Sequence, residues 1–144
     1  MSLLRGSTFP DPVADEGRHS IGLAVRVGAD VRAAIRDGYR INLAERSAPG
    51  PIAPLVRVDH PAVLVESVKL AEDRSGDVIV RLYESEGARA AAEVTLDFDV
   101  DGVIVTDLIE REIDAPAGFA HEGRSVKLAL RPFQLLTLRI RRSS

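Results

Sequence analysis

The feature that most constrains this chain is a two-residue hydrophobic period that recurs from residue 55 to the C-terminus. Side chains on a β-strand alternate between the two faces of a sheet, so this period is typical of strands that bury one face. Turn-forming residues separate the periodic segments by roughly ten to twelve residues, as in an antiparallel β-sandwich. We therefore predict an all-β fold of about seven or eight short strands. The predicted strands carry Val56 and Val58; Val63, Val65, Val68 and Leu70; Val78, Val80 and Leu82; Val94, Leu96, Phe98 and Val100; a further strand or two between Val103 and Ile113; Val126, Leu128 and Leu130; and Leu136, Leu138 and Ile140.

Interruptions in this period predict local features of the sheet. A phase slip at Glu66-Ser67 indicates a β-bulge. Asp101-Gly102 is a dipeptide favoured in tight hairpins, so we expect the strand over residues 94–100 to end there in a hairpin turn. Residues 116–123 are predicted to form a loop, and Pro132 interrupts the last periodic region.

The first third of the chain has a different pattern. Residues 5–18 are rich in Pro, Gly and Asp, which predicts an extended loop. Residues 21–27 alternate and predict one more strand. Between Asp30 and Leu43 the apolar residues recur at three and four positions, which predicts a short amphipathic helix near residues 30–43 with Asp30 as its N-cap. Residues 47–54 contain three prolines and a glycine and predict a loop.

The length and charge of the chain exclude several classes of protein. A chain of 144 residues suits one domain with a real core, and we interpret residues 1–144 as a single domain, with residues 1–3 as an added leader. The 19 Lys and Arg residues against 22 Asp and Glu residues argue against a nucleic-acid or membrane partner. The absence of cysteine excludes disulfides and thiolate metal sites. No signal-peptide pattern is present, so we expect a cytoplasmic protein.

An acidic cluster in the N-terminal loop offers the densest set of metal-ligating side chains. Asp11, Asp15, Glu16 and His19 lie within nine residues of one another. Oxygen and imidazole groups at this density could hold a divalent cation, but only His19 supplies nitrogen, and the spacing matches no calcium loop. A solvated or interface loop, in which the aspartates accept backbone N–H groups, explains the cluster more simply.

Other polar residues give weaker signals. His60 and His121 have no partner at motif spacing and are most simply surface residues. Glu84 and Glu86 would share one face at a strand end, where a catalytic acid pair competes with the commoner interpretation of a solvated edge. An arginine cluster on the last strand is interpreted as an outward-facing, soluble edge; it comprises Arg131, Arg139, Arg141 and Arg142. A free-standing carbohydrate-binding module remains an alternative, although the supply of aromatic side chains is thin.

Four ordered blocks of sequence resemble the C-terminal region of the zinc-dependent α-mannosidases of glycoside hydrolase family 38. The resemblance begins with Leu3-Leu4-Arg5 and the segment from Pro10 to His19, and it extends to Ile140, essentially the whole chain. The other three blocks are the segments Val65–Asp73, Val80–Arg89 and Leu130–Arg139.

This resemblance implies that the chain is the C-terminal β-sandwich domain of a larger α-mannosidase. In that family the catalytic carboxylates and the zinc ligands belong to a separate N-terminal domain, so we assign no catalytic and no metal-ligating residue to this chain. The implied partner is the catalytic domain of the same polypeptide, whose substrates are α-mannosides and whose cofactor is zinc. We expect Asp11, Asp15, Glu16 and His19 to lie at the interdomain surface or at the rim of that active site. The alternatives are an independent carbohydrate-binding module and a small metal-binding β-domain.

Overall fold

The structure is a computed structural model that describes residues 9–13 and 16–143 of the chain. It divides into two compact units, Met1–Arg46 and Ser47–Ser144. Among the described residues, no helix has the length and apolar character needed to cross a membrane.

The first unit contains the predicted helix. Helix α1 spans Val31–Asn42, and the Asp30 side chain caps it by accepting the backbone N–H of Ala33 at 2.7 Å. The helix ends where the N–H of Leu43 donates to the carbonyl of Tyr39 at 2.9 Å. Asp37 faces the preceding segment and pairs with Arg26 at 3.2 Å. The predicted helix and its N-cap are confirmed.

The strand predicted over residues 21–27 is wrong. These residues form no strand, and Val25 and Val27 are 95% and 97% exposed. A strand must bond its backbone to a neighbouring strand, and the described part of this unit contains no other strand to pair with. The alternating pattern therefore lacks the partner that would turn it into a sheet.

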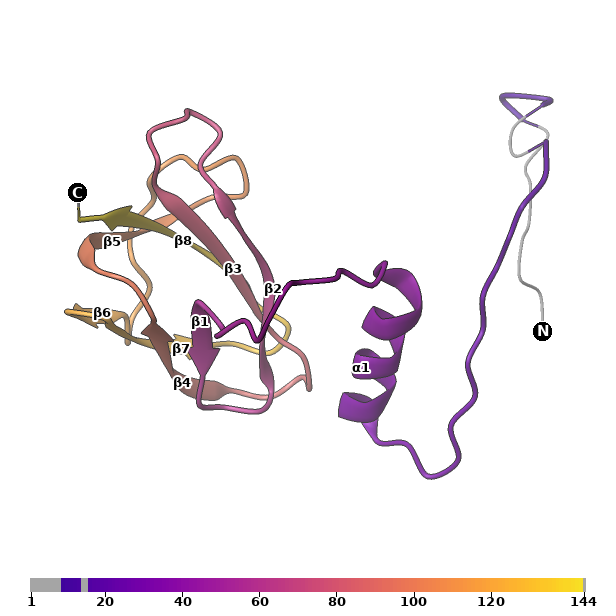
Figure 1. The fold of residues 1–144 in the computed structure, drawn as a ribbon, viewed down its shortest axis with the longest axis horizontal. Coiled ribbons are helices and arrows are strands. Elements are labelled where there is room, and N and C mark those ends of the chain that lie inside the picture. Colours follow the sequence, from indigo (N-terminus) through magenta and orange to yellow (C-terminus); the bar gives the residue numbers. More distant parts are fainter. Residues whose placement is uncertain (1–8, 14–15, 144) are drawn as a thin grey trace. The chain divides into compact units, whose positions relative to one another are not determined.

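The second unit is the predicted β-sandwich. Its eight strands form two four-stranded antiparallel sheets with the orders β1-β4-β7-β6 and β2-β3-β8-β5 (Figure 1). The strands are β1 (Val56–Val58), β2 (Val63–Leu70), β3 (Val78–Glu84), β4 (Ala90–Leu96), β5 (Val100–Thr106), β6 (Ala120–Glu122), β7 (Ser125–Leu130) and β8 (Leu135–Arg142). The all-β class and the antiparallel sandwich are confirmed.

The alternating residues meet in one core between the sheets. Leu82, Val94, Leu96, Val126 and Leu138 are among its fully buried members. The predicted bulge is also present, as a shift of register between Val65 and Ser67 where β2 pairs with β3.

Two local predictions are wrong in an informative way. Asp101 and Gly102 do not form a hairpin turn; they lie inside β5, where the register with β8 shifts between Val100 and Gly102. Strands β4 and β5 belong to different sheets, so residues 97–99 cross from one sheet to the other. The hydrophobic period runs through the crossing because both sheets face the same core.

The loop predicted over residues 116–123 contains the short strand β6.

Candidate functional site

The described members of the N-terminal acidic cluster lie on the surface, and two of them make contacts within their own loop. The carboxylate of Asp11 accepts the backbone N–H of Val13 at 3.0 Å, and the N–H of Glu16 donates to the carbonyl of Val13 at 3.2 Å. Asp11, Glu16 and His19 are exposed, and Asp15 lies outside the described residues. No group of three or more His, Cys, Asp or Glu side chains that could hold a metal is found among the residues the structure describes. The role predicted for this cluster at an interdomain surface stays a prediction.

The histidines serve local backbone contacts. The Nδ1 atom of His60 accepts the N–H of Ala62 at 3.2 Å. The Nε2 atom of His121 lies 2.7 Å from the carbonyl oxygen of Gly123, at the turn between β6 and β7. Each ring thus contacts the backbone of its own loop.

Glu84 corrects the interpretation of the Glu84–Glu86 pair as a solvated edge. Its side chain is fully buried, and its carboxylate accepts backbone N–H groups from Glu86 at 2.8 Å, Gly87 at 2.8 Å and Phe133 at 2.9 Å. Burial raises the pKa of this carboxyl, but the N–H donors, first that of Phe133, outweigh it and leave the pKa below its ordinary value. Glu84 is therefore an ionised group that ties the loop after β3 to the turn before β8.

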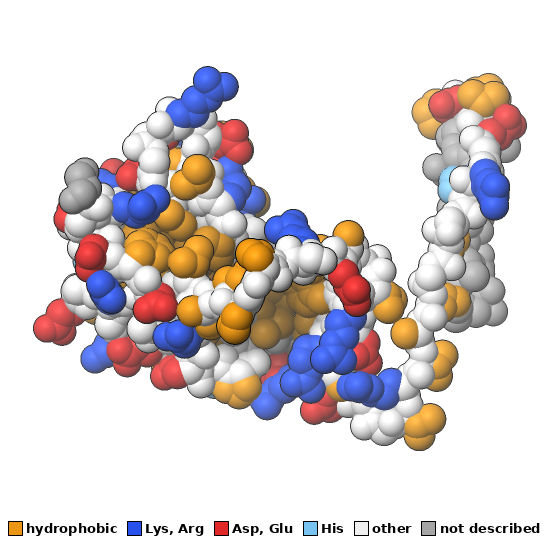
Figure 2. Space-filling view, in the orientation of Figure 1, with side chains coloured by type: hydrophobic (Ala, Val, Ile, Leu, Met, Phe, Trp, Pro, Cys, Tyr) orange, Lys and Arg blue, Asp and Glu red, His pale blue; other side chains and the backbone are white. Residues whose placement is uncertain are grey.

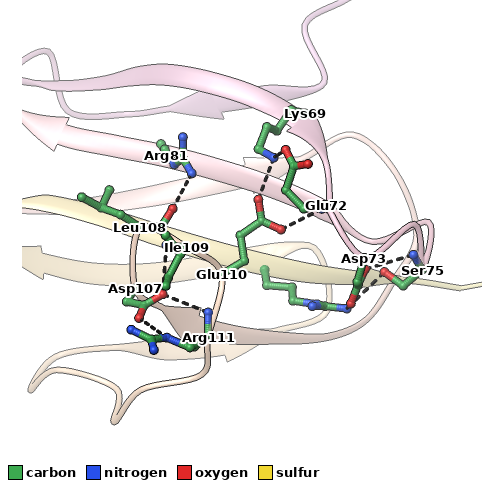
Figure 3. A network of polar contacts seen from close by, with 11 residues as sticks. Lys69, Glu72, Asp73, Ser75, Arg81, Asp107, Leu108, Ile109, Glu110 and Arg111 are labelled. Atoms are coloured by element: carbon green, nitrogen blue, oxygen red, sulfur yellow. Dashed lines mark hydrogen bonds and ion pairs between the residues drawn. The ribbon is translucent and has the colours of Figure 1, made fainter.

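An ionic network covers the outer face of the sheet β2-β3-β8-β5 (Figure 3). Glu110 lies on the loop after β5, and its carboxylate pairs with the Lys69 ammonium at 2.6 Å and accepts the N–H of Glu72 at 2.8 Å. Lys69 also pairs with the Glu72 carboxylate at 2.6 Å. The contact with Lys69 lowers the pKa of Glu110, and the contact with Glu110 raises the pKa of Lys69. The network thus fastens the loop to β2.

The same loop has a second attachment. Asp107 accepts the N–H of Arg111 at 2.9 Å and pairs with its guanidinium at 2.9 Å, and the Arg111 N–H is the main cause of the lowered pKa of Asp107. The Arg81 side chain on β3 donates to the carbonyl of Leu108 at 2.8 Å (Figure 3). These contacts hold residues 107–111 in a fixed shape over the sheet.

Arg139 corrects the interpretation of the last strand as a soluble edge. Strand β8 lies between β3 and β5, and the Arg139 side chain is only 19% exposed. It pairs with Asp77 at 2.7 Å and with Asp73 at 2.7 Å. Hydrogen bonds from Ser75, followed by the contact with Arg139, lower the pKa of Asp73 to about 2. Of the other members of the predicted cluster, Arg141 and Arg142 are exposed, while Arg131 bonds to Gln134 within its own turn.

Four polar atoms beneath this network have no hydrogen-bond partner among the described residues. They are Ser67 Oγ, Arg81 Nε, Thr137 Oγ1 and Thr106 Oγ1. The strand register places these residues in one row across β2, β3, β8 and β5. Buried polar atoms usually have a hydrogen-bond partner, so this row of atoms without one lowers the stability of the sheet.

A pocket of about 670 Å³ opens between the loop after β5 and the start of β8. Its lining includes the apolar side chains of Leu108, Ile109, Ile113 and Leu135, all of which are partly solvent-exposed, and the buried Thr106 and Thr137. Figure 2 shows the sandwich unit in space-filling view, with charged side chains spread over the face in view and hydrophobic side chains gathered between them. No local sequence pattern predicts the pocket, because its walls come from segments far apart in the sequence: the end of β5 with the loop after it, and the start of β8.

Comparisons with known proteins confirm the resemblance noted in the sequence. Residues 62–138 match the family described as the glycosyl hydrolases family 38 C-terminal beta sandwich domain. The chain is 33% identical over 150 residues to the human protein "Alpha-mannosidase 2C1" and 30% identical over 149 residues to its mouse counterpart. Each comparison covers 96% of this chain and 14% of the relative, so the chain spans about a seventh of the length of these relatives. The chain thus belongs to the glycosyl hydrolases family 38 C-terminal β-sandwich domain family.

Proposed function

We propose that this chain is a non-catalytic domain that packs against and supports the catalytic domain of an α-mannosidase in the same polypeptide. The relatives are named as α-mannosidases and are about seven times longer than the aligned region, which leaves room for a separate catalytic part. That part would cleave α-mannosides in mannose metabolism and hold the zinc ion.

The observation that carries this proposal is the commitment of the carboxylates to the fold. A glycosidase of this type needs a carboxylic acid with a raised pKa beside a second, free carboxylate. Wherever a shift is resolved for a described acidic group, the pKa is lowered, and the carboxylate is held by backbone N–H groups or by a cation. These groups are Asp73, Glu84, Asp107 and Glu110. Such groups support a loop well and donate a proton poorly at neutral pH.

The described residues do not fit the zinc ion that the family implies. Zinc in enzymes is usually held by three side chains that combine histidine with cysteine or carboxylate. The described parts of the chain contain no group of three or more His, Cys, Asp or Glu side chains placed to hold a metal ion. The proposal therefore assigns the ion to the catalytic domain.

A deletion in the complete polypeptide tests the supporting role. Removing residues 47–144 should expose the surface that the sandwich covers, so the remaining protein should unfold at a lower temperature and lose mannosidase activity faster on warming. A truncated protein with the same melting temperature and the same kinetics as the complete one would contradict the proposal.

A second candidate function is carbohydrate binding by the sandwich itself. The pocket after β5 favours it, because two buried hydroxyls without partners, on Thr106 and Thr137, belong to residues that line it. Calorimetric titration of mannose and mannobiose into the 144-residue chain separates the two functions. A supporting domain gives no heat of binding, and a saturable heat would favour the carbohydrate-binding module.

A further inference from the structure

The turn before β8 presents an aromatic side chain in an unfavourable backbone conformation. The N–H of Gln134 donates to the carbonyl of Arg131 at 3.0 Å, which closes a four-residue turn. Pro132 occupies the second position, and Phe133 occupies the third with φ of +56°. This is the pattern of a type II turn, whose third position strongly favours glycine. A bulky residue there costs stability, and such strain tends to be retained where it serves a function.

Two contacts fix the position of Phe133. The Oε2 oxygen of the buried Glu84 carboxylate accepts both the Phe133 N–H and the N–H of Gly87. The Phe133 ring also lies over Gly87, since a Cβ atom at Gly87 would lie only 2.7 Å from the Cζ atom of the ring. Gly87 itself has φ of +77° and leaves the space that the ring occupies. The backbone and the ring are therefore both positioned before any partner binds.

The ring so positioned is not part of the core. Phe133 is 73% exposed. Leu135, two residues later, is also exposed and lines the pocket together with Leu108, Ile109 and Ile113. These five side chains make up more than half of the nine large exposed hydrophobics described within residues 47–144. Four of them line the pocket, and Phe133 lies in the turn whose first and last residues, Arg131 and Gln134, line the same pocket. Exposed apolar side chains grouped in this way mark an interaction site.

We propose that Phe133 is the anchor by which this sandwich docks onto an apolar surface of the catalytic part of its own polypeptide. The docking surface consists of Phe133, Leu135, Leu108, Ile109 and Ile113. This inference rests on the function proposed above and specifies the part of the chain that makes the contact. A pre-positioned aromatic side chain is an effective anchor, because little conformational entropy is lost when it is buried.

The chemistry of the pocket margin fits an apolar partner surface. The charged residues that line the pocket are two aspartates and two arginines, so their formal charges cancel. Asp107 and Arg111 already pair with each other, and Arg131 bonds to Gln134. The pocket therefore has no excess of one charge sign that would attract a strongly charged partner. The relatives extend far beyond the aligned region, so the catalytic part supplies a covering surface that is always present at high effective concentration.

Matched asparagine substitutions test the anchor. Asparagine tolerates a positive φ, so Phe133→Asn should leave the melting temperature of the 144-residue chain unchanged or raise it. In the complete polypeptide the same substitution should lower the melting temperature and shorten the half-life of the mannosidase activity. Leu70→Asn is the control, because Leu70 is 62% exposed and lies at the end of β2, outside the docking surface. It should have the same effect in the isolated chain and in the complete polypeptide.

Hydrogen exchange separates failure of the anchor from failure of the supporting role. Amides of residues 133–135 should exchange at least about tenfold more slowly in the complete polypeptide than in the isolated chain. If other segments of the chain gain protection and residues 133–135 do not, the anchor is refuted and the supporting role stands. If no segment gains protection, both are refuted. A Phe133→Asn variant that behaves like Leu70→Asn in the complete polypeptide would also overturn the anchor.

Discussion

Gly87→Ala should destabilise the chain through both its backbone and the Phe133 ring. An alanine at φ of +77° costs about 1 kcal/mol in backbone strain. Its Cβ atom would lie 2.7 Å from the ring Cζ and 3.0 Å from Cε2, well inside the usual contact distance. Turning the exposed ring away from its preferred rotamer adds about 0.5–1.5 kcal/mol. We expect a total loss of about 1.5–2.5 kcal/mol in the free energy of unfolding.

Gly76→Ala separates these two contributions. Gly76 has φ of +90°, and a Cβ atom there would meet nothing within 4 Å. It should therefore lose only the backbone contribution of about 1 kcal/mol. In a Phe133→Ala background the ring is absent, so the loss in free energy of unfolding caused by Gly87→Ala should fall to the same value. The loss caused by Gly76→Ala should be the same in both backgrounds.

Urea denaturation of the 144-residue chain, with its single and double variants, measures these free energies. The predicted coupling between Gly87→Ala and Phe133→Ala is about 0.5–1.5 kcal/mol. Equal costs for Gly87→Ala in both backgrounds, or equal costs for Gly87→Ala and Gly76→Ala, would refute the contact between ring and glycine.

Three further predictions concern the sheet and its network. Thr137→Val replaces a buried hydroxyl that has no described partner by a methyl group of similar size, so urea denaturation should show a gain of about 1 kcal/mol; a loss of that size would show that the hydroxyl is hydrogen-bonded. The lowered pKa of Asp73 means that its ionised form is favoured by folding; this stability is complete above pH 3.8 and is lost as the pH falls towards about 2. Between pH 5 and pH 2 the melting temperature should therefore fall less steeply for Asp73→Asn than for the parent chain. An equal fall in melting temperature for both proteins would contradict the contact of Asp73 with Ser75 and Arg139. Glu110→Gln weakens the attachment of the loop to Lys69, so amides of residues 108–112 should exchange faster while those of β3 do not; unchanged exchange in the loop would assign its order to Asp107 and Arg111 alone.

The sequence pattern predicted the strands because local periodicity reports which side of a strand is buried. The alternation predicts Leu82 and Leu138 in the core, and both are fully buried there. Periodicity does not say which strands share a sheet. The crossing at residues 97–99 therefore has the same hydrophobic period as a strand that continues to a hairpin.

The same limit applies to the polar residues. Glu84 lies 49 positions before Phe133, so no local pattern shows that its carboxylate binds the Phe133 backbone. The pairing of Arg139 with Asp73 spans 66 positions and is equally hidden. Pro132 followed by a residue other than glycine is a local signal of the strained turn, because proline favours the second position of a turn and glycine the third.

Hydrolysis of a chromogenic α-mannoside tests the central claim most directly. The isolated chain, with and without added zinc, and the complete polypeptide are compared at equal concentration. We predict hydrolysis by the complete polypeptide and none by the isolated chain. Hydrolysis by the isolated chain that disappears on substitution of Glu84 or Glu110 would contradict the assignment of this sandwich as a supporting domain.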